Sequence, residues 1–391
     1  VSLVVRKRER ERERASEQRG ANMAPTTAAI TPTTLAQEKT LGERYVMHKK
    51  DRARVGHKDF SDDIPVISLA GIDEDYPGGR RTEILKNIVS ACEEWGIFQV
   101  VDHGVRDELF TQMFELSRQF FSMPDEYKLS YLMTEGKRGG FILSSHFPDE
   151  VVANWRELML FIERPIHGRD YSQWPDKPEG WRPAIDEYGV KLTEVAGKLY
   201  ELLSEGLGLE KDALIKTLGE VHGHLVVNHY PKCPQPDLAV GLKRHTDPSS
   251  MTMLVQDQVG GLQATQDAGK TWVTVRPIKN AIVVNLGDHL YYMTNGRYQR
   301  ADHQAIVNGE HDRMSVAMFF HAENEAKIYP LKVKEGEKPL LEEPITYAEM
   351  KRRHTNLYIE RTRITKLSEK ENWSLEELDR KLAELEQGTN A

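Results

Sequence analysis

The stretch His245-Thr246-Asp247 places an imidazole and a carboxylate two residues apart in the chain. Side chains two apart on an extended strand point to the same face, so His245 and Asp247 can bind one metal ion while Thr246 turns away. His303, much later in the chain, can bring a third ligand from another strand. Two imidazoles and one carboxylate on one side of an Fe(II) ion leave positions open for substrates. The pattern therefore predicts a catalytic iron site rather than a structural one.

Arg313 and Ser315 follow His303 and lead into the apolar run Val316-Ala317-Met318-Phe319-Phe320. The planar guanidinium of Arg313 presents a fork of donors that matches a carboxylate, and Ser315 adds a hydroxyl on the same strand face. We therefore expect a pocket for a small dicarboxylate, a 2-oxo acid, beside the metal.

An H-x-D sequence alone is weak evidence, because surface histidines and aspartates fall two apart by chance in many chains. The combination of H-x-D, a distant histidine and an R-x-S strand favours the metal site over that alternative. Six other histidines have no partner at a comparable spacing, and we expect them on the surface or behind the metal ligands: His222, His224, His229, His289, His311 and His321.

The 391 residues carry a formal net charge of −8 at pH 7, and 39% of them are hydrophobic. This composition predicts a large core, and the negative charge argues against nucleic acid or an anionic membrane as a partner. No apolar run approaches the ~18 residues of a membrane span. Two cysteines, Cys92 and Cys233, give no disulfide framework and indicate a reducing, cytoplasmic location. We expect a monomer that binds a small molecule.

Four regions are predicted along the chain. Residues 1–60 are expected to be a disordered tail, because their charge run over 8–14 cannot bury apolar surface, and residues 1–22 are expected to lie upstream of a natural start at Met23. The other regions are an N-terminal α/β region over 61–205, a jelly-roll catalytic core over 206–335 and a C-terminal helical extension over 336–391.

Apolar residues at helical spacing predict four helices. They cover 82–96, with Thr82 as the cap, 109–121, roughly 186–207, and 374–388, which begins with a capping box at Ser374. We expect the last helix to pack back over the mouth of the domain rather than to recruit a partner.

Between about Leu225 and Phe320 the sequence alternates short strand-like runs with turn signals such as Gly260-Gly261. This alternation predicts a double-sheet jelly roll, whose inward side chains can enclose a cavity. The expected fold is therefore mainly β with α (α+β): a double-stranded β-helix core braced by N-terminal and C-terminal helices.

Several runs resemble the plant 2-oxoglutarate-dependent dioxygenases. Besides the iron triad, these runs are W-G-I-F-Q-V-V-D-H-G-V at 95–105, N-H-Y-P-K-C-P-Q-P at 228–236 and N-L-G-D-H-L at 285–290. Longer stretches resemble flavanone 3-hydroxylase and flavone synthase I, at 139–146, 174–181, 241–248, 256–265 and 301–305. The similarity covers roughly residues 60–365.

The resemblance implies that the triad binds Fe(II) and that Arg313 and Ser315 hold the distal carboxylate of 2-oxoglutarate, while Tyr230 and Asn228 assist near the metal. It also implies O2 as a second cosubstrate, ascorbate as an activity-supporting reductant, and a flavanone as the substrate. Hydroxylation at C3 gives a dihydroflavonol, whereas removal of hydrogen from C2 and C3 gives a flavone. Pocket walls are expected from Phe141, Leu143, Leu158 and Phe319, for which core packing is an equally open alternative.

The chain departs from flavanone 3-hydroxylases at two places expected near the iron. Ser249-Ser250 stands where those enzymes usually have Gly-Thr, and M-F-F-H-A at 318–322 stands where they usually have Thr-Phe-Gln-Asn-Pro. Flavanone 3-hydroxylation is the leading hypothesis. Desaturation to a flavone, or oxidation of another plant phenolic or hormone, is the alternative. A non-catalytic barrel that binds a metabolite is least favoured, because the triad and Arg313 are intact.

Overall fold

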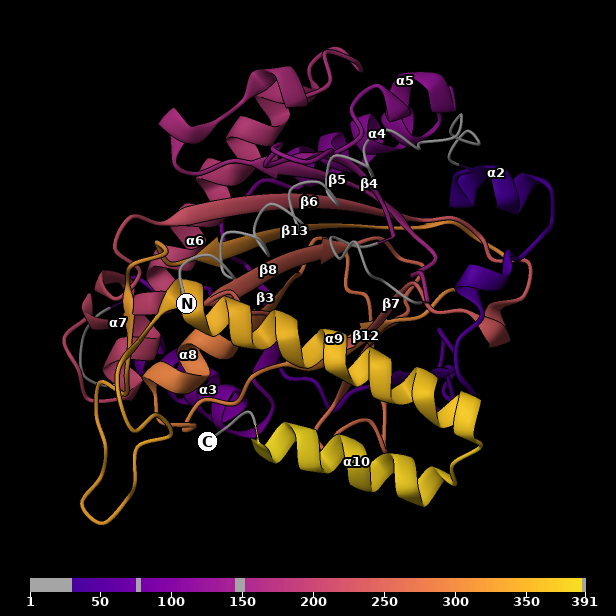
Figure 1. Ribbon diagram of the computed structural model, residues 1–391. Helices are drawn as coiled ribbons and strands as arrows, with labels where there is room; N and C mark the ends of the chain where they lie inside the picture. The colour runs from indigo at the N-terminus through magenta and orange to yellow at the C-terminus, as the bar shows by residue number, and fades with distance from the viewer. Residues whose placement is uncertain (1–29, 75–78, 145–151, 389–391) are drawn as a thin grey trace, which may run out of the picture.

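The computed structural model describes residues 30–74, 79–144 and 152–388 (Figure 1). The expected start at Met23, the charge run over 8–14 and the end of the 139–146 run lie outside the described residues.

Two sheets form the core. The larger sheet contains, in spatial order, β2 (Val66–Ser68), β3 (Ile97–Val101), β11 (Ile282–Leu286), β8 (Met251–Gln256), β13 (Arg313–His321), β6 (His222–Tyr230), β5 (Glu157–Ile162) and β4 (Gly140–Leu143). The smaller sheet contains β1 (Phe60–Ser61), β10 (Val273–Val275), β9 (Leu262–Thr265), β12 (Asp302–Ala305) and β7 (Leu242–His245). Strands from both sides of the predicted 205/206 boundary share the larger sheet, and the boundaries themselves stay a prediction.

The inner faces of the two sheets meet in one apolar cluster. Leu254 and Ala317 of the larger sheet pack there with Leu262 and Ala264 of the smaller sheet. Residues two apart share a face, so the alternate residues of the larger sheet, such as Met253, point outward into a second cluster. The predicted α+β fold with a jelly-roll core is confirmed.

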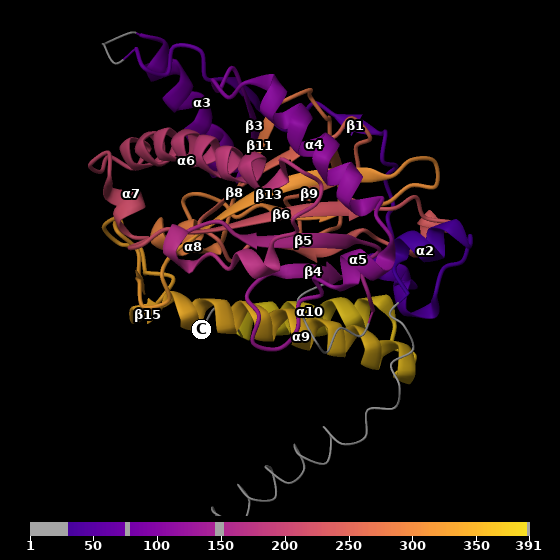
Figure 2. The same cartoon turned by 90° about the horizontal axis from the view of Figure 1, so that it is seen from above.

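Three helices cover the outer face of the larger sheet: α3 (Arg80–Glu94), α4 (Asp107–Phe121) and α6 (Trp181–Gly206) (Figure 2). Two details of the prediction were wrong. Thr82 does not cap α3 but lies inside its first turn. α6 begins at Trp181 rather than near residue 186, because Pro183 is tolerated in the first turn of a helix.

Several shorter elements connect these helices and strands. They are α5 (Asp125–Leu129), α7 (Ala213–Lys216), α8 (Asp288–Met293), the strand pair β14 (Lys327–Ile328) and β15 (Ile345–Thr346), and the 3-10 helices η1 (Glu43–Tyr45), η2 (Lys49–Asp51), η3 (Ile166–Gly168), η4 (Tyr171–Gln173) and η5 (Pro236–Leu238). No helix within the described ranges is long and apolar enough to cross a bilayer.

Two C-terminal helices, α9 (Tyr347–Glu371) and α10 (Leu375–Gly388), lie on the side of the sheets opposite α6 (Figure 2). Ser374 caps α10 as predicted, because its Oγ accepts a hydrogen bond from the Glu377 backbone N–H at 3.1 Å. The long helix beside the barrel is α9, which the sequence analysis did not predict, and α10 packs against α9. α10 thus returns to the domain through α9 and through an ion pair between Asp379 and Lys50.

Residues 30–60 pack against the core, so the prediction of a disordered tail as far as residue 60 was wrong for this part. Thr31 caps α2 (Pro32–Gln37), and the Tyr45 ring meets the Trp155 ring edge to face at 5.0 Å. Both rings are almost completely buried. A few well-placed apolar side chains are enough to order a polar segment when the core offers them a pocket.

Buried charges anchor α2 to the larger sheet. The Thr33 backbone N–H donates to Glu157 Oε1 at 2.8 Å, and Lys128 Nζ lies 3.3 Å from Glu157 Oε2. Burial alone would raise the pKa of Glu157, but the hydrogen bond and charge of His229, with the charge of Lys128, lower it below its ordinary value. The buried carboxylate is therefore ionised and paired.

We expect Glu157→Ala to lower the free energy of unfolding by about 3 kcal/mol, at the lower end for a broken buried ion pair, because Lys128 loses this buried carboxylate but keeps its ion pair with Asp125 at 2.9 Å. Chemical denaturation with urea measures the change. Glu201→Ala, at an exposed position within α6, is the control and should change stability by less than about 0.5 kcal/mol. Equal effects of the two substitutions would contradict the importance of this buried pair.

Candidate iron and 2-oxoglutarate site

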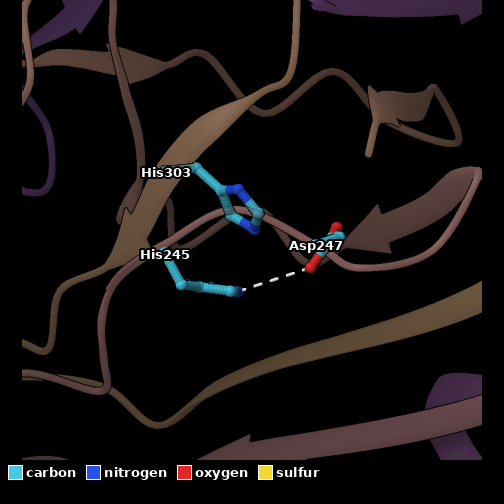
Figure 3. A group of neighbouring side chains, drawn as sticks. All are labelled: His245, Asp247 and His303. Carbon is cyan, nitrogen blue, oxygen red and sulfur yellow. Dashed lines mark ion pairs between the residues drawn. The ribbon is translucent and has the colours of Figure 1, made fainter. Parts of the chain in front are cut away.

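The two histidines of the predicted triad lie directly opposite each other. β12 runs antiparallel to β7 with His303 in register with His245, so both side chains leave the smaller sheet on the same face. The centroids of the two rings are 4.2 Å apart. Strand pairing, rather than proximity in sequence, brings these imidazoles together (Figure 3).

Each imidazole is oriented by a backbone carbonyl. The Nδ1 atom of His245 is 2.9 Å from the Lys243 carbonyl oxygen, and that of His303 is 3.0 Å from the Ala301 carbonyl oxygen. A carbonyl can only accept a hydrogen bond, so Nδ1 carries the proton in both rings. The Nε2 atoms therefore keep their lone pairs for a metal ion.

Asp247 completes the group, although not from the strand that was predicted to carry it. β7 ends at His245, and Asp247 lies in the following loop. Its Oδ1 is 3.5 Å from His245 Nε2, and one ligand atom from each triad residue lies within 4.8 Å of the others. Thr252 on β8 donates its hydroxyl to Asp247 Oδ2 at 2.7 Å and thereby holds the carboxylate in place.

The ionisation states of these side chains suit a divalent cation. Burial would raise the pKa of Asp247, but the neighbouring imidazoles of His303 and His245 and the hydroxyl of Thr252 lower it well below its ordinary value. Burial, with the charge of His245, lowers the pKa of His303. An ionised carboxylate and a neutral imidazole are the forms that bind metal.

A buried guanidinium lies on the inner face of the larger sheet. Register places Arg313 opposite Tyr230, and Ser315 opposite both Asn228 and Gln256. The Arg313 Nη2 donates to Gln256 Oε1 at 3.0 Å, and its carbon Cζ lies 5.0 Å from the centroid of the Tyr230 ring. Arg313 is 2% exposed, yet its Nε and Nη1 have no hydrogen-bond partner among the described residues. A buried cation with free donors fits a carboxylate ligand.

Only two of the four predicted pocket walls face the barrel interior. Leu158 and Phe319 pack with Ile142 in an inner cluster. Phe141 and Leu143 instead pack on the opposite face of β4, in the cluster shared with the helices. For Phe141 and Leu143 the alternative of core packing therefore holds, and the inward position on this strand belongs to Ile142, because neighbouring residues of a strand lie on opposite faces.

The six other histidines differ in their surroundings. His311 is exposed as expected, and His222, His224 and His321 are half-buried. His229 and His289 are buried, so of the two expected locations, on the surface or behind the metal ligands, the surface is wrong for them. Burial lowers the pKa of His289 to about 3, so this ring is a neutral core residue of α8. His229 lies between two acids, with Nδ1 3.8 Å from Glu157 and Nε2 3.6 Å from Asp312.

Helix α9 is linked by hydrogen bonds to the loop that carries Asp247. A cavity of about 430 Å³ lies against α9 and reaches His245. His354 on α9 is hydrogen-bonded through Nδ1 to Asp288 Oδ2 at 2.8 Å, and the Asp288 backbone N–H donates to the Asp247 carbonyl oxygen at 2.8 Å. Sequence reasoning missed this connection, as it missed Gln256 and Thr252, because only strand register and folding bring these side chains to the site.

The family model of the 2OG-Fe(II) oxygenase superfamily matches residues 221–322, and a model described as the non-haem dioxygenase in morphine synthesis N-terminal region matches residues 64–177. The chain belongs to the 2OG-Fe(II) oxygenase superfamily, whose members use Fe(II) and 2-oxoglutarate. It is 54% identical to flavanone 3-dioxygenase of Petroselinum crispum, over 88% of this chain and 93% of the relative.

Flavone synthase of the same plant is 52% identical, over 86% of this chain and 91% of the relative. Among solved structures, JOX2 in complex with 2OG, Fe and JA superposes with a TM-score of 0.73 at 34% identity, covering 82% of this chain and 91% of that one.

Thr252→Val removes the hydroxyl that holds Asp247 while it keeps the size of the side chain. We expect the affinity for Fe(II) to fall about 10–100-fold, because a metal ligand without its orienting hydrogen bond binds more weakly. Anaerobic titration of the apoprotein with Fe(II) measures this. Thr111→Val on α4, whose hydroxyl bonds only the Asp107 carbonyl in the structure, should leave the affinity unchanged. A Thr252→Val protein with unchanged affinity would contradict the orienting role.

Proposed function

We propose that this protein is a flavanone-oxidising dioxygenase that hydroxylates C3 of a naringenin-type flavanone to give a dihydroflavonol. The observation that carries the proposal is the buried Arg313 with free donors on the inner face of a barrel that also holds the triad. Identities of 51–54% to flavanone and naringenin 3-dioxygenases across most of the chain support the choice of substrate.

In this proposal His245, Asp247 and His303 bind Fe(II) on one side. Bound Fe(II) supplies the activation of O2, coupled to the conversion of 2-oxoglutarate into succinate and CO2. One oxygen atom goes to succinate and the other to the flavanone. Three protein ligands leave room for both cosubstrates at the metal.

The cosubstrate is held by the inner face of β6 and β13. The Arg313 guanidinium donates to the distal carboxylate of 2-oxoglutarate, and Ser315 adds a hydroxyl hydrogen bond. The Tyr230 ring supports the guanidinium from one side, and Asn228 lies next to Ser315. Because these groups are buried, their charge interactions with the carboxylate are stronger than they would be in water.

The flavanone lies against the apolar inner wall. Leu158 and Phe319 form this wall, with Ile142 beside them. The Phe319 ring stacks on the His321 ring, with 8° between their planes and 6.1 Å between their centroids. Flat apolar surfaces of this kind suit a planar aromatic substrate.

A second candidate function is C2–C3 desaturation to a flavone. The flavone synthase of Petroselinum crispum is within two percentage points of the flavanone 3-dioxygenase in identity, so similarity does not separate the two reactions. Both reactions remove a hydrogen at the same metal, and the orientation of the flavanone decides which product forms. Oxidation of another plant phenolic or hormone is the third candidate, and the structurally similar JOX2 was solved in complex with a different small molecule, JA.

Further properties belong to the same proposal. We place the enzyme in the cytoplasm as a monomer, and ascorbate supports its activity by keeping the iron reduced. Both cysteines are buried and unpaired, which suits a reducing compartment.

The test is incubation of the purified protein with Fe(II), ascorbate, 2-oxoglutarate, O2 and naringenin, followed by mass spectrometry. We expect dihydrokaempferol as the main product, with one succinate formed for each flavanone oxidised. Apigenin as the main product would favour the second candidate. Succinate that forms only with a hormone in a substrate panel would favour the third, and no turnover of any flavanone would end the proposal.

A further inference from the structure

A second arginine points into the barrel beside the cosubstrate residues. Arg156 immediately precedes β5 and is two residues before Leu158, whose side chain faces the interior. It is 7% exposed, and its Nη1 donates to Asn228 Oδ1 at 3.0 Å. Arg156 has no role in the proposed reaction as described so far.

This contact fixes the direction of the Asn228 side-chain amide. A guanidinium has only donors, so the atom of Asn228 that faces Arg156 must be its carbonyl oxygen. The amide nitrogen is then turned the other way, where Nδ2 lies 3.5 Å from Ser315 Oγ. The contact with Arg156 thus determines which end of the Asn228 amide is the oxygen and which is the nitrogen.

The direction of the amide decides what Ser315 can do. Since Asn228 presents N–H groups to Ser315, the Ser315 oxygen can accept, and its own hydroxyl proton is free to be donated elsewhere. With the amide reversed, Oδ1 would accept the Ser315 proton and compete with a bound carboxylate for it. The observed arrangement therefore directs the Ser315 proton to the pocket beside Arg313.

Arg156 is itself held firmly. Its Nε donates to the Ser144 carbonyl oxygen at 2.7 Å, and the Ser144 backbone N–H donates back to the Arg156 carbonyl oxygen at 3.0 Å. The guanidinium must bond Ser144 and Asn228 at once, which needs two donors in a fixed planar arrangement. Lysine, with a single ammonium on a flexible stem, cannot reproduce this geometry.

We infer that Arg156 is a positioning residue for 2-oxoglutarate, which acts through Asn228 to aim the Ser315 hydroxyl at the distal carboxylate. The inference rests on the proposed assignment of Arg313 and Ser315 to the cosubstrate. It predicts that Arg156 matters for the distal carboxylate and not for the 2-oxo acid group at the metal.

The test is calorimetric binding to the full chain loaded with Mn(II), which avoids turnover. 2-Oxoglutarate is compared with 2-oxobutyrate, which lacks the distal carboxylate. We expect Arg156→Met to weaken 2-oxoglutarate binding about 10-fold, because a hydrogen bond to a charged group is lost, and to leave 2-oxobutyrate binding within 2-fold. Arg156→Lys should show an intermediate loss. Arg276→Met, which removes a surface ion pair with Asp62, is the control and should bind both acids like the wild type.

A second arm tests the route through Ser315. In a Ser315→Ala background, Arg156→Met should weaken 2-oxoglutarate binding by less than 2-fold, since there is no hydroxyl left to aim. Equal weakening of both acids, or an undiminished 10-fold loss in the Ser315→Ala background, would overturn the inference. If Arg156→Met does not fold by thermal melting, Arg156→Lys decides in the same assay. A wild-type protein that fails to bind 2-oxoglutarate would instead contradict the cosubstrate assignment.

Discussion

The pairing of β12 with β7 is the constraint on which the rest of the site depends. Register places His303 opposite His245, and a shift by one residue would send His303 to the other face of the smaller sheet. Asp247 adds the anionic group from the loop beyond β7, held there by Thr252 on the other sheet. The three candidate iron ligands thus require both sheets of the barrel to be in place, which explains why a large scaffold surrounds a small reaction centre.

The larger sheet holds a buried cation, the guanidinium of Arg313, whose free donors can bind an anion. Arg313 has a single side-chain partner in Gln256 and an aromatic face in Tyr230, and its remaining donors are unused within the described chain. Such a group destabilises the empty protein, and a carboxylate relieves that cost on binding. The free energy of unfolding that the empty protein loses at this position therefore contributes to the affinity and specificity for a dicarboxylate.

Residue types and spacing predicted the chemistry better than they predicted the geometry. The triad and the R-x-S strand could be recognised from residue type and spacing, because few kinds of site require two histidines, a carboxylate and an arginine together. Phe141 and Ile142 show what residue types could not predict. Every residue of β4 is apolar or glycine, so only the pairing with β5 decides which face of the strand lies inside the barrel. α9 was missed because it is rich in charge, and the order of residues 30–60 was missed because it depends on pockets such as the one beside Trp155.

We propose that His245, Asp247 and His303 together hold one ferrous ion. The most direct measurement is the iron content of anaerobically reconstituted wild-type protein and of Asp247→Ala after gel filtration. We expect one Fe(II) per wild-type chain and less than about a tenth of that in the variant, because the only anionic ligand of the triad is gone. An Asp247→Ala protein that is folded and retains a full equivalent of iron would contradict it.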